Sequence, residues 1–171
     1  MINVNDTKQC INQFKKLMVA DKYHVTNPVP AKVMSDLMQS LPPADWDETK
    51  QKVFYDIQKL LSIRPEYAQL FNEMDGLEYN GLTIYSLAQA ENGIPSWDNI
   101  YIQNLDNRDN DIYASPHLTD KIIIGEDGMS VFCYNFTDNV FEIRDRVAPD
   151  YVIESHKDFA DFLTALYSTV C

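Results

Sequence analysis

Through the first 74 residues, apolar side chains recur at the spacing of one helix face. This pattern predicts helices at residues 6–20 and 33–41, a third that begins at Asp45, and a fourth from Pro65 to Met74. Asp45 is placed at the start of the third helix because Glu48 follows three residues later, as in a capping box. A helical N-terminal half is therefore expected.

After Met74 the apolar residues come in short bursts, which is typical of strands. Gly76 is expected to take the left-handed conformation that ends a helix, and Asn80-Gly81 predicts a tight turn before a strand at 82–86. The polar, acidic stretch 104–116 predicts an exposed loop. Further strands are predicted at 100–102, 121–125 and 151–154.

Residues 130–136 and 140–145 flank Asp138-Asn139 and predict a hairpin with a two-residue turn. This turn would pair Phe136 with Phe141 and Tyr134 with Ile143 on one face. Ser155 is expected to cap a last helix. We therefore predict an α+β fold: one domain over residues 1–171, in which N-terminal helices (1–47 the first portion) precede a mostly antiparallel sheet and a C-terminal helix closes it.

The charge of the chain is concentrated in its second half. Residues 1–74 contain nine basic and nine acidic residues, whereas residues 75–171 contain five basic and 17 acidic ones, so the net charge of −12 arises there. Such a surface disfavours nucleic acid and anionic membranes as partners and accelerates encounter with a basic protein. The alternative is that acidity only keeps the protein dispersed.

The remaining sequence features point away from secretion and from cofactor chemistry. No apolar run is long enough for a membrane span, and the first residues do not resemble a signal peptide, so we expect a cytoplasmic protein. The three cysteines lack metal-ligand spacing, and no phosphate-binding glycine motif is present. We expect no metal and no cofactor.

Candidate catalytic and partner-binding residues lie mainly among the acidic and aromatic side chains. An enzyme would require a carboxylate pair such as Asp109 and Asp111 in a pocket, but no nucleophile or base accompanies them, so the chain is expected not to be an enzyme. Aromatic residues beside carboxylates can anchor a protein partner, although they can equally cover the sheet. The aromatic candidates are Trp97, Tyr101 and Tyr113.

The order of several motifs resembles the SUKH superfamily, in particular its YrhA-like branch. They include Pro-Glu-Tyr from Pro65, the Asp75-Gly76 and Asn80-Gly81 turns, the hairpin, and the final helix. The resemblance covers about residues 60–167 and is looser before Glu48. Arg64 departs from the pattern, which usually has Leu before this proline.

The resemblance implies an α+β domain without catalytic residues and a role as a bacterial immunity protein. Such a protein would bind and neutralise a cognate toxin, often a basic nuclease. A SUKH-type interaction or regulatory module without a toxin is the alternative. We expect the acidic contribution to partner binding from Asp106, Asp109, Asp111, Glu126, Asp127 and Asp138.

Overall fold

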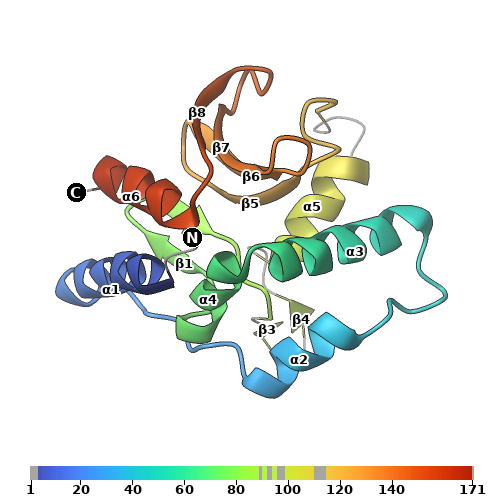
Figure 1. Cartoon of the computed structure of the whole chain (residues 1–171), viewed down its shortest axis with the longest axis horizontal. Helices are drawn as coiled ribbons and strands as arrows, with labels where there is room; N and C mark the ends of the chain where they lie inside the picture. The colour runs from blue at the N-terminus through green and yellow to red at the C-terminus, as the bar shows by residue number, and fades with distance from the viewer. Residues whose placement is uncertain (1–3, 89, 92–93, 96–98, 110–114, 171) are drawn as a thin grey trace.

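The computed structural model describes residues 4–88, 90–91, 94–95, 99–109 and 115–170. It confirms the α+β class, with four helices before a six-stranded antiparallel sheet and a helix after it (Figure 1). The helices are α1 (Val4–Ala20), α2 (Ala31–Gln39), α3 (Glu48–Ile63), α4 (Pro65–Glu73), α5 (Ile100–Asp109) and α6 (Phe159–Val170).

The sheet has the strand order β1-β2-β5-β6-β7-β8, and a separate pair, β3-β4, lies between β2 and α5 in sequence. Figure 1 shows strands β5 to β8 curling together above the helices. The strands are β1 (Leu77–Tyr79), β2 (Leu82–Ile84), β3 (Ala90–Glu91), β4 (Ile94–Pro95), β5 (Ile122–Glu126), β6 (Ser130–Asn135), β7 (Val140–Asp145) and β8 (Val152–His156).

Two predicted helix caps were wrong. The cap of α3 is Asp47, not Asp45, because the Asp47 side chain accepts a hydrogen bond from the Lys50 backbone N–H at 2.9 Å. Ser155 does not cap α6, since it lies inside β8, opposite Glu142 of β7. The first turn of α6 instead begins at Asp158, whose carbonyl accepts from the Phe162 N–H.

The turns between α4 and β2 are as predicted. Gly76 has φ of +76°, and both Asn80 and Gly81 have positive φ in the turn that joins β1 to β2. At Gly76 a Cβ atom would lie only 2.7 Å from the Ile84 carbonyl oxygen. Only glycine fits there, which brings the end of α4 directly against β2.

The hairpin between β6 and β7 exists, but its predicted register was wrong by two residues. Tyr134 pairs with Phe141 and Asn135 with Val140, so the turn spans residues 136–139. The Asn135 side chain accepts hydrogen bonds from the backbone N–H groups of Thr137 and Asp138, which closes this longer turn. Because the shift is even, Tyr134, Phe141 and Ile143 stay on their predicted face, whereas Phe136 now belongs to the turn.

Two adjoining predictions were also wrong over residues 100–109, whereas residues 110–114 of the predicted loop lie outside the described residues. Residues 100–102 are not a strand and residues 104–109 are not a loop, because together they form helix α5. The buried positions of this helix include Asn104 and Asn107, and the Arg108 side chain is only 6% exposed. Several polar residues of α5 therefore face the protein, which hides the usual apolar signal of a helix.

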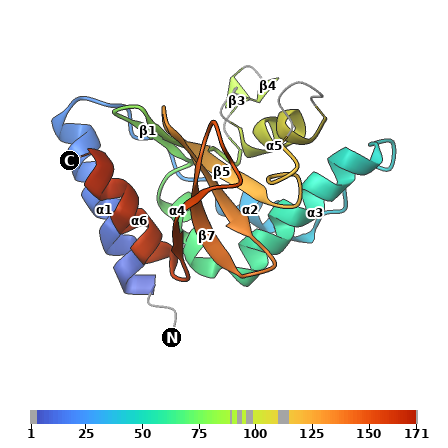
Figure 2. The ribbon, with the colours of Figure 1, turned by 90° about the horizontal axis from the view of Figure 1, so that it is seen from above.

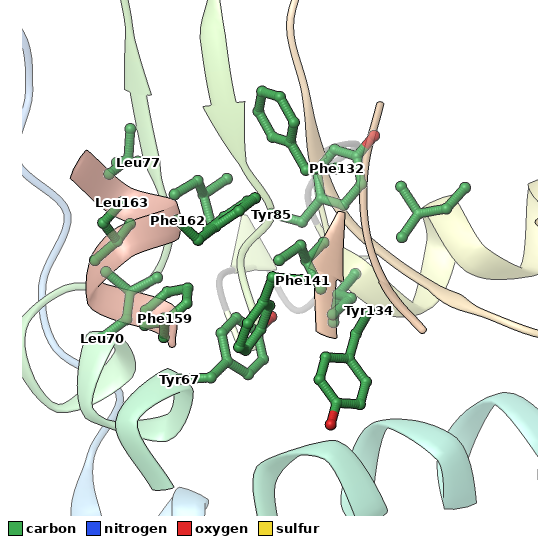
Figure 3. Packing of buried hydrophobic residues seen from close by; sticks show 14 of the residues in the cluster. Tyr67, Leu70, Leu77, Tyr85, Phe132, Tyr134, Phe141, Phe159, Phe162 and Leu163 are labelled. Atoms are coloured by element: carbon green, nitrogen blue, oxygen red, sulfur yellow. The ribbon is translucent and has the colours of Figure 1, made fainter. Parts of the chain in front are cut away.

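Aromatic side chains from α4, α6 and the hairpin form the core on one face of the sheet (Figure 3). Tyr67 of α4 packs edge-to-face on Phe159 of α6, and Phe141 of β7 lies within 5.5 Å of Phe162, centroid to centroid. Figure 2 shows α1 beside α6, where Phe14 contacts Tyr167. Helix α5 lies instead between α3 and the edge of β5.

Candidate functional site: a polar cleft beside helix α5

Asn104 fixes helix α5 against strand β5. Its side-chain amide donates to the Ile123 carbonyl and accepts from the Ile123 N–H, both at 2.8 Å. Strand β2 pairs with β5 only at Glu126 and Gly125, so it does not reach these groups of Ile123. Asn104 thus makes the hydrogen bonds that a neighbouring strand would otherwise make. This contact also fixes which side chains of α5 lie next to the sheet.

A second contact fixes the end of α5. Arg108 forms a buried ion pair with Asp56 of α3 at 2.9 Å and donates to the Lys121 carbonyl at 3.0 Å. The helix is therefore held to the sheet by Asn104 and to the helical layer by Arg108. Its position between the two layers leaves a hollow on each side.

The hollow on the sheet side is a polar cleft of about 370 Å³. Gln103, Asp106 and Asn107 of α5 line it together with Glu126 of β5 and Arg146. Glu126 and Arg146 face each other at 3.3 Å, with side chains 30% and 50% exposed. Its apolar wall consists of Tyr85, Leu118, Ile123 and Val131.

Two turns border this cleft and carry most of the surrounding charge. Residues 126–130 and 145–151 are joined by hydrogen bonds from Arg146 to the carbonyls of Met129 and Asp127. We call these two turns together with Asp106 the acidic end of the sheet. Its described charged residues are Asp106, Glu126, Asp127, Asp145, Asp150 and Arg146.

The acidic end also exposes large apolar side chains that sequence reasoning missed. Met129 is 81% exposed, Val147 94% and Tyr151 62%. Met129 and Val147 lie in the two connecting turns. Exposed methionine and tyrosine beside carboxylates are typical of protein-binding surfaces.

The predicted partner-binding residues are only partly brought together. Asp106 and Glu126 line the same cleft, and Asp127 is in the adjoining turn. Asp138 is at the other end of the β6–β7 hairpin, hydrogen-bonded to Asn135 at 3.2 Å. Asp109 is exposed at the end of α5. Trp97, Asp111 and Tyr113 lie outside the described residues.

Tyr101 lies on the opposite side of α5, in an apolar pocket of about 440 Å³ between α2, α3 and α5. Its ring stacks on Phe54 of α3, and burial raises the pKa of its hydroxyl to about 12. Tyr101 therefore does not face the acidic residues with which it was grouped. Other side chains of this pocket include Leu37, Trp46 and Lys50.

A buried polar cluster on β6 and β7 was not predicted as such. Arg144 donates to Glu142 at 2.8 and 2.9 Å, and Cys133 lies 3.7 Å from the same carboxylate. Burial, followed by the negative charge of Glu142, raises the pKa of the Cys133 thiol to about 12. Because the thiolate is the reactive form, this environment makes Cys133 inert.

Two further findings concern metal binding and membrane spans in the described part of the chain. There, no group of three or more His, Cys, Asp or Glu side chains is placed to hold a metal ion. None of the helices described combines the length and the apolarity of a membrane span. The surface chemistry of the acidic end is accordingly the feature on which we base a function.

Comparisons with known proteins give one uncharacterized relative. The chain is 29% identical over 129 residues to the uncharacterized protein YrhA of Escherichia coli (strain K12), covering 75% of this chain and 91% of YrhA. No protein-family model matches the sequence. No solved structure matches it either.

Proposed function

We propose that this protein is a SUKH-type, non-enzymatic binding protein whose acidic end holds a basic protein, as an immunity protein holds a nuclease-type toxin. The observation that carries the proposal is the composition of the acidic end. Two carboxylates and one guanidinium line a cleft there, three more carboxylates lie in the adjoining turns, and large apolar side chains are exposed beside them. Charge and apolar contact are thereby combined on one surface.

The charge would act before contact. A nuclease must attract phosphate, so its active cleft is commonly basic. A surface of the opposite sign raises the rate of encounter, and this effect is lost as salt screens it. Because the excess of acidic residues lies wholly within residues 75–171, the field is directed rather than uniform over the molecule.

The exposed apolar side chains would act after contact. Met129, Val147 and Tyr151 would lose contact with water when a partner covers the two turns, which stabilises the complex. Such anchors surrounded by polar groups are the usual composition of an interface centre and rim. The resemblance of the sequence to SUKH proteins independently favours a binding role over catalysis.

The test is to recover the partner and then change the charge. Tagged protein would be purified from its native host and bound proteins identified by mass spectrometry. We expect a basic toxin domain, retained by the wild type and lost from the Glu126→Lys/Asp150→Lys variant. The matched control is Asp36→Lys/Asp45→Lys, which makes the same charge change at exposed positions of the N-terminal half.

With the purified partner, Glu126→Lys/Asp150→Lys should lower the association rate at low salt about tenfold or more. The association rate of this variant should also depend less steeply on salt concentration. The control variant Asp36→Lys/Asp45→Lys should change the association rate and its salt dependence much less. Equal effects of the two variants would contradict a directed interface at the acidic end. Recovery of an acidic partner, or of none, would contradict the proposed function itself.

A further inference from the structure

Helix α2 borders the apolar pocket of about 440 Å³ between α2, α3 and α5, and Leu37 of this helix lines it. No residue of α2 is buried, although Met34, Leu37 and Met38 pack partly against the core. The helix is held to α3 by Gln58, whose side-chain amide donates to the carbonyls of Leu37 and Ser40 at 2.9 and 3.1 Å. An apolar group bound in the pocket would cover more of the apolar side of α2, which would stabilise both.

One wall of the pocket is a row of three aromatic rings. Trp46 packs edge-to-face on Phe54 with ring centroids 6.2 Å apart, and Phe54 stacks on Tyr101 at 6.3 Å. The rings come from the segment before α3, from α3 and from α5. A flat aromatic ligand packs on such rings in offset or edge-to-face contacts. The pocket therefore favours an aromatic body.

The wall that contains Leu87 and Ala88 is held in place by buried polar side chains. The carboxylate of Asp75 accepts from the backbone N–H groups of Leu87 and Ala88 at 2.6 and 3.1 Å. The Asn99 side chain donates to the Leu87 carbonyl at 3.2 Å and accepts from the Tyr101 N–H at 2.9 Å. These contacts fix the shape of the pocket from within the protein, as is usual for a small-molecule site.

Lys50 is the one charged residue among the described residues that line the pocket. It lies exposed at the edge, and its ammonium makes no ion pair with a described residue. Asp47, at the start of the same helix, accepts from the backbone N–H of Lys50 instead. The Tyr101 hydroxyl stays neutral at ordinary pH, because burial raises its pKa to about 12. The pocket thus combines an apolar interior with a single cation at its edge.

We propose that this pocket binds a small aromatic monocarboxylate. The aromatic body would lie between Leu37 and the three rings, and the carboxylate would meet the Lys50 ammonium at the edge. This inference does not rest on the proposed function. The pocket is on the other side of α5 from the polar cleft, and its one charge has the opposite sign to that of the acidic end.

A monocarboxylate suits the pocket better than other ligands of similar size do. An organic cation would be repelled by Lys50, and an uncharged aromatic compound would forgo the charge-assisted contact. A phosphate monoester carries up to two charges and three strong acceptor oxygens, which a single ammonium does not match. The carboxylate balances Lys50 one for one.

A pair of matched small molecules tests the site directly. Isotope-labelled protein would be titrated with naphthylacetate and, separately, with naphthylacetamide, which has nearly the same shape but no charge. We expect naphthylacetate to shift the indole N–H signal of Trp46 and the methyl signals of Leu37 and Leu105. Its dissociation constant should be about 0.1–1 mM, as for other ligands of this size. The amide should bind about fivefold more weakly or worse, because it lacks the charge.

Variants then assign the contacts. Lys50→Gln should weaken binding of naphthylacetate about fivefold or more and leave that of naphthylacetamide unchanged. Lys16→Gln is the matched control, since it makes the same charge change at an exposed position of α1 outside the pocket, and it should change neither. Leu37→Trp should fill the pocket and weaken both ligands about tenfold or more. Because α2 has no buried residue, this variant should retain the unfolding midpoint of the wild type.

Several results would overturn the inference. Equal affinities of the acid and the amide, or equal effects of Lys50→Gln and Lys16→Gln, would exclude an anionic ligand. Signals that shift away from the pocket, or none that shift at about 10 mM, well above the expected dissociation constant, would exclude the site. Tighter binding of acetyl-Gly-Phe than of naphthylacetate would assign the pocket to the carboxyl terminus of a peptide. None of these outcomes depends on partner capture, so this inference and the proposed function fail separately.

Discussion

At the scale of single residues, Gly76 has no room for a side chain. Its φ is +76°, and an added Cβ would lie 2.7 Å from the Ile84 carbonyl oxygen and 2.9 Å from the Ser86 nitrogen. Both neighbours are backbone atoms, which cannot rotate away. Gly76→Ala should therefore lower the free energy of unfolding by about 3 kcal/mol or more, combining backbone strain with displacement of β2. Denaturant unfolding followed by circular dichroism measures this.

Gly81 provides the control for that substitution. Its φ of +86° is similar, but nothing lies within 4 Å of an added Cβ. Gly81→Ala should cost only the backbone term, about 1–2 kcal/mol. If the two variants unfold alike, close approach of the chain at Gly76 is not what requires glycine there.

Arg64 shows what a sequence alone does not reveal about one residue. It departs from the expected leucine, and the structure gives it specific contacts that leucine lacks. Its Nε donates to the Tyr134 hydroxyl at 3.0 Å, its Nη1 to the Lys157 carbonyl at 3.0 Å, and its Nη2 to the Asn139 carbonyl. One guanidinium thus joins the start of α4 to the hairpin tip and the start of α6. These partners are distant in sequence, so no local pattern could predict them.

At the scale of elements, α5 marks the limit of pattern-based prediction. Helices α1 to α4 and α6 carry apolar residues on the inward face, and each was predicted from that spacing. In α5 the inward positions include Asn104, Asn107 and Arg108, which read as loop residues. What decides the structure there is a tertiary contact with Ile123, and tertiary contacts override local preference.

The hairpin illustrates the same limit in register. Both a two-residue and a four-residue turn keep Phe141 and Ile143 on the core face, so the apolar pattern does not distinguish them. The Asn135 side chain decides between them by accepting from two backbone N–H groups of the turn. The alternation of apolar and polar residues predicts which face of the sheet a side chain lies on. Predicting its cross-strand partner also requires the geometry of the turn.

Replacing Asn104 should detach α5 locally. Asn104→Ala leaves the buried N–H and C=O of Ile123 without side-chain partners, each costing about 1–3 kcal/mol. We therefore expect a loss of about 3 kcal/mol or more and faster hydrogen exchange at the Ile123 amide. Asn107→Ala, one turn later, removes an amide without a described partner at Nδ2 and should cost much less. Equal losses would show that Asn104 is not a specific anchor.

At the scale of the whole molecule, the acidic imbalance was visible in the sequence, but its distribution on the surface was not. Asp106 and Glu126 are 20 positions apart in number, and only the placement of α5 over β5 brings them to one cleft. The exposed Met129 and Val147 were missed because apolar side chains in turns follow no period. Tyr101 was misgrouped because α5 turns it toward α3.

The packing of α1 on α6 has a consequence for how the chain reaches its fold. Cys10 contacts the Ala160 carbonyl, 150 positions later, and Phe14 packs on Tyr167 with centroids 5.4 Å apart. During synthesis, the part of α1 that packs on α6 therefore stays uncovered until α6 has left the ribosome. We expect nascent chains arrested before α6 to remain protease-sensitive within α1, and chains that expose α6 to be protected there. Protection of α1 in the shorter chains would show that α4 alone suffices to cover it.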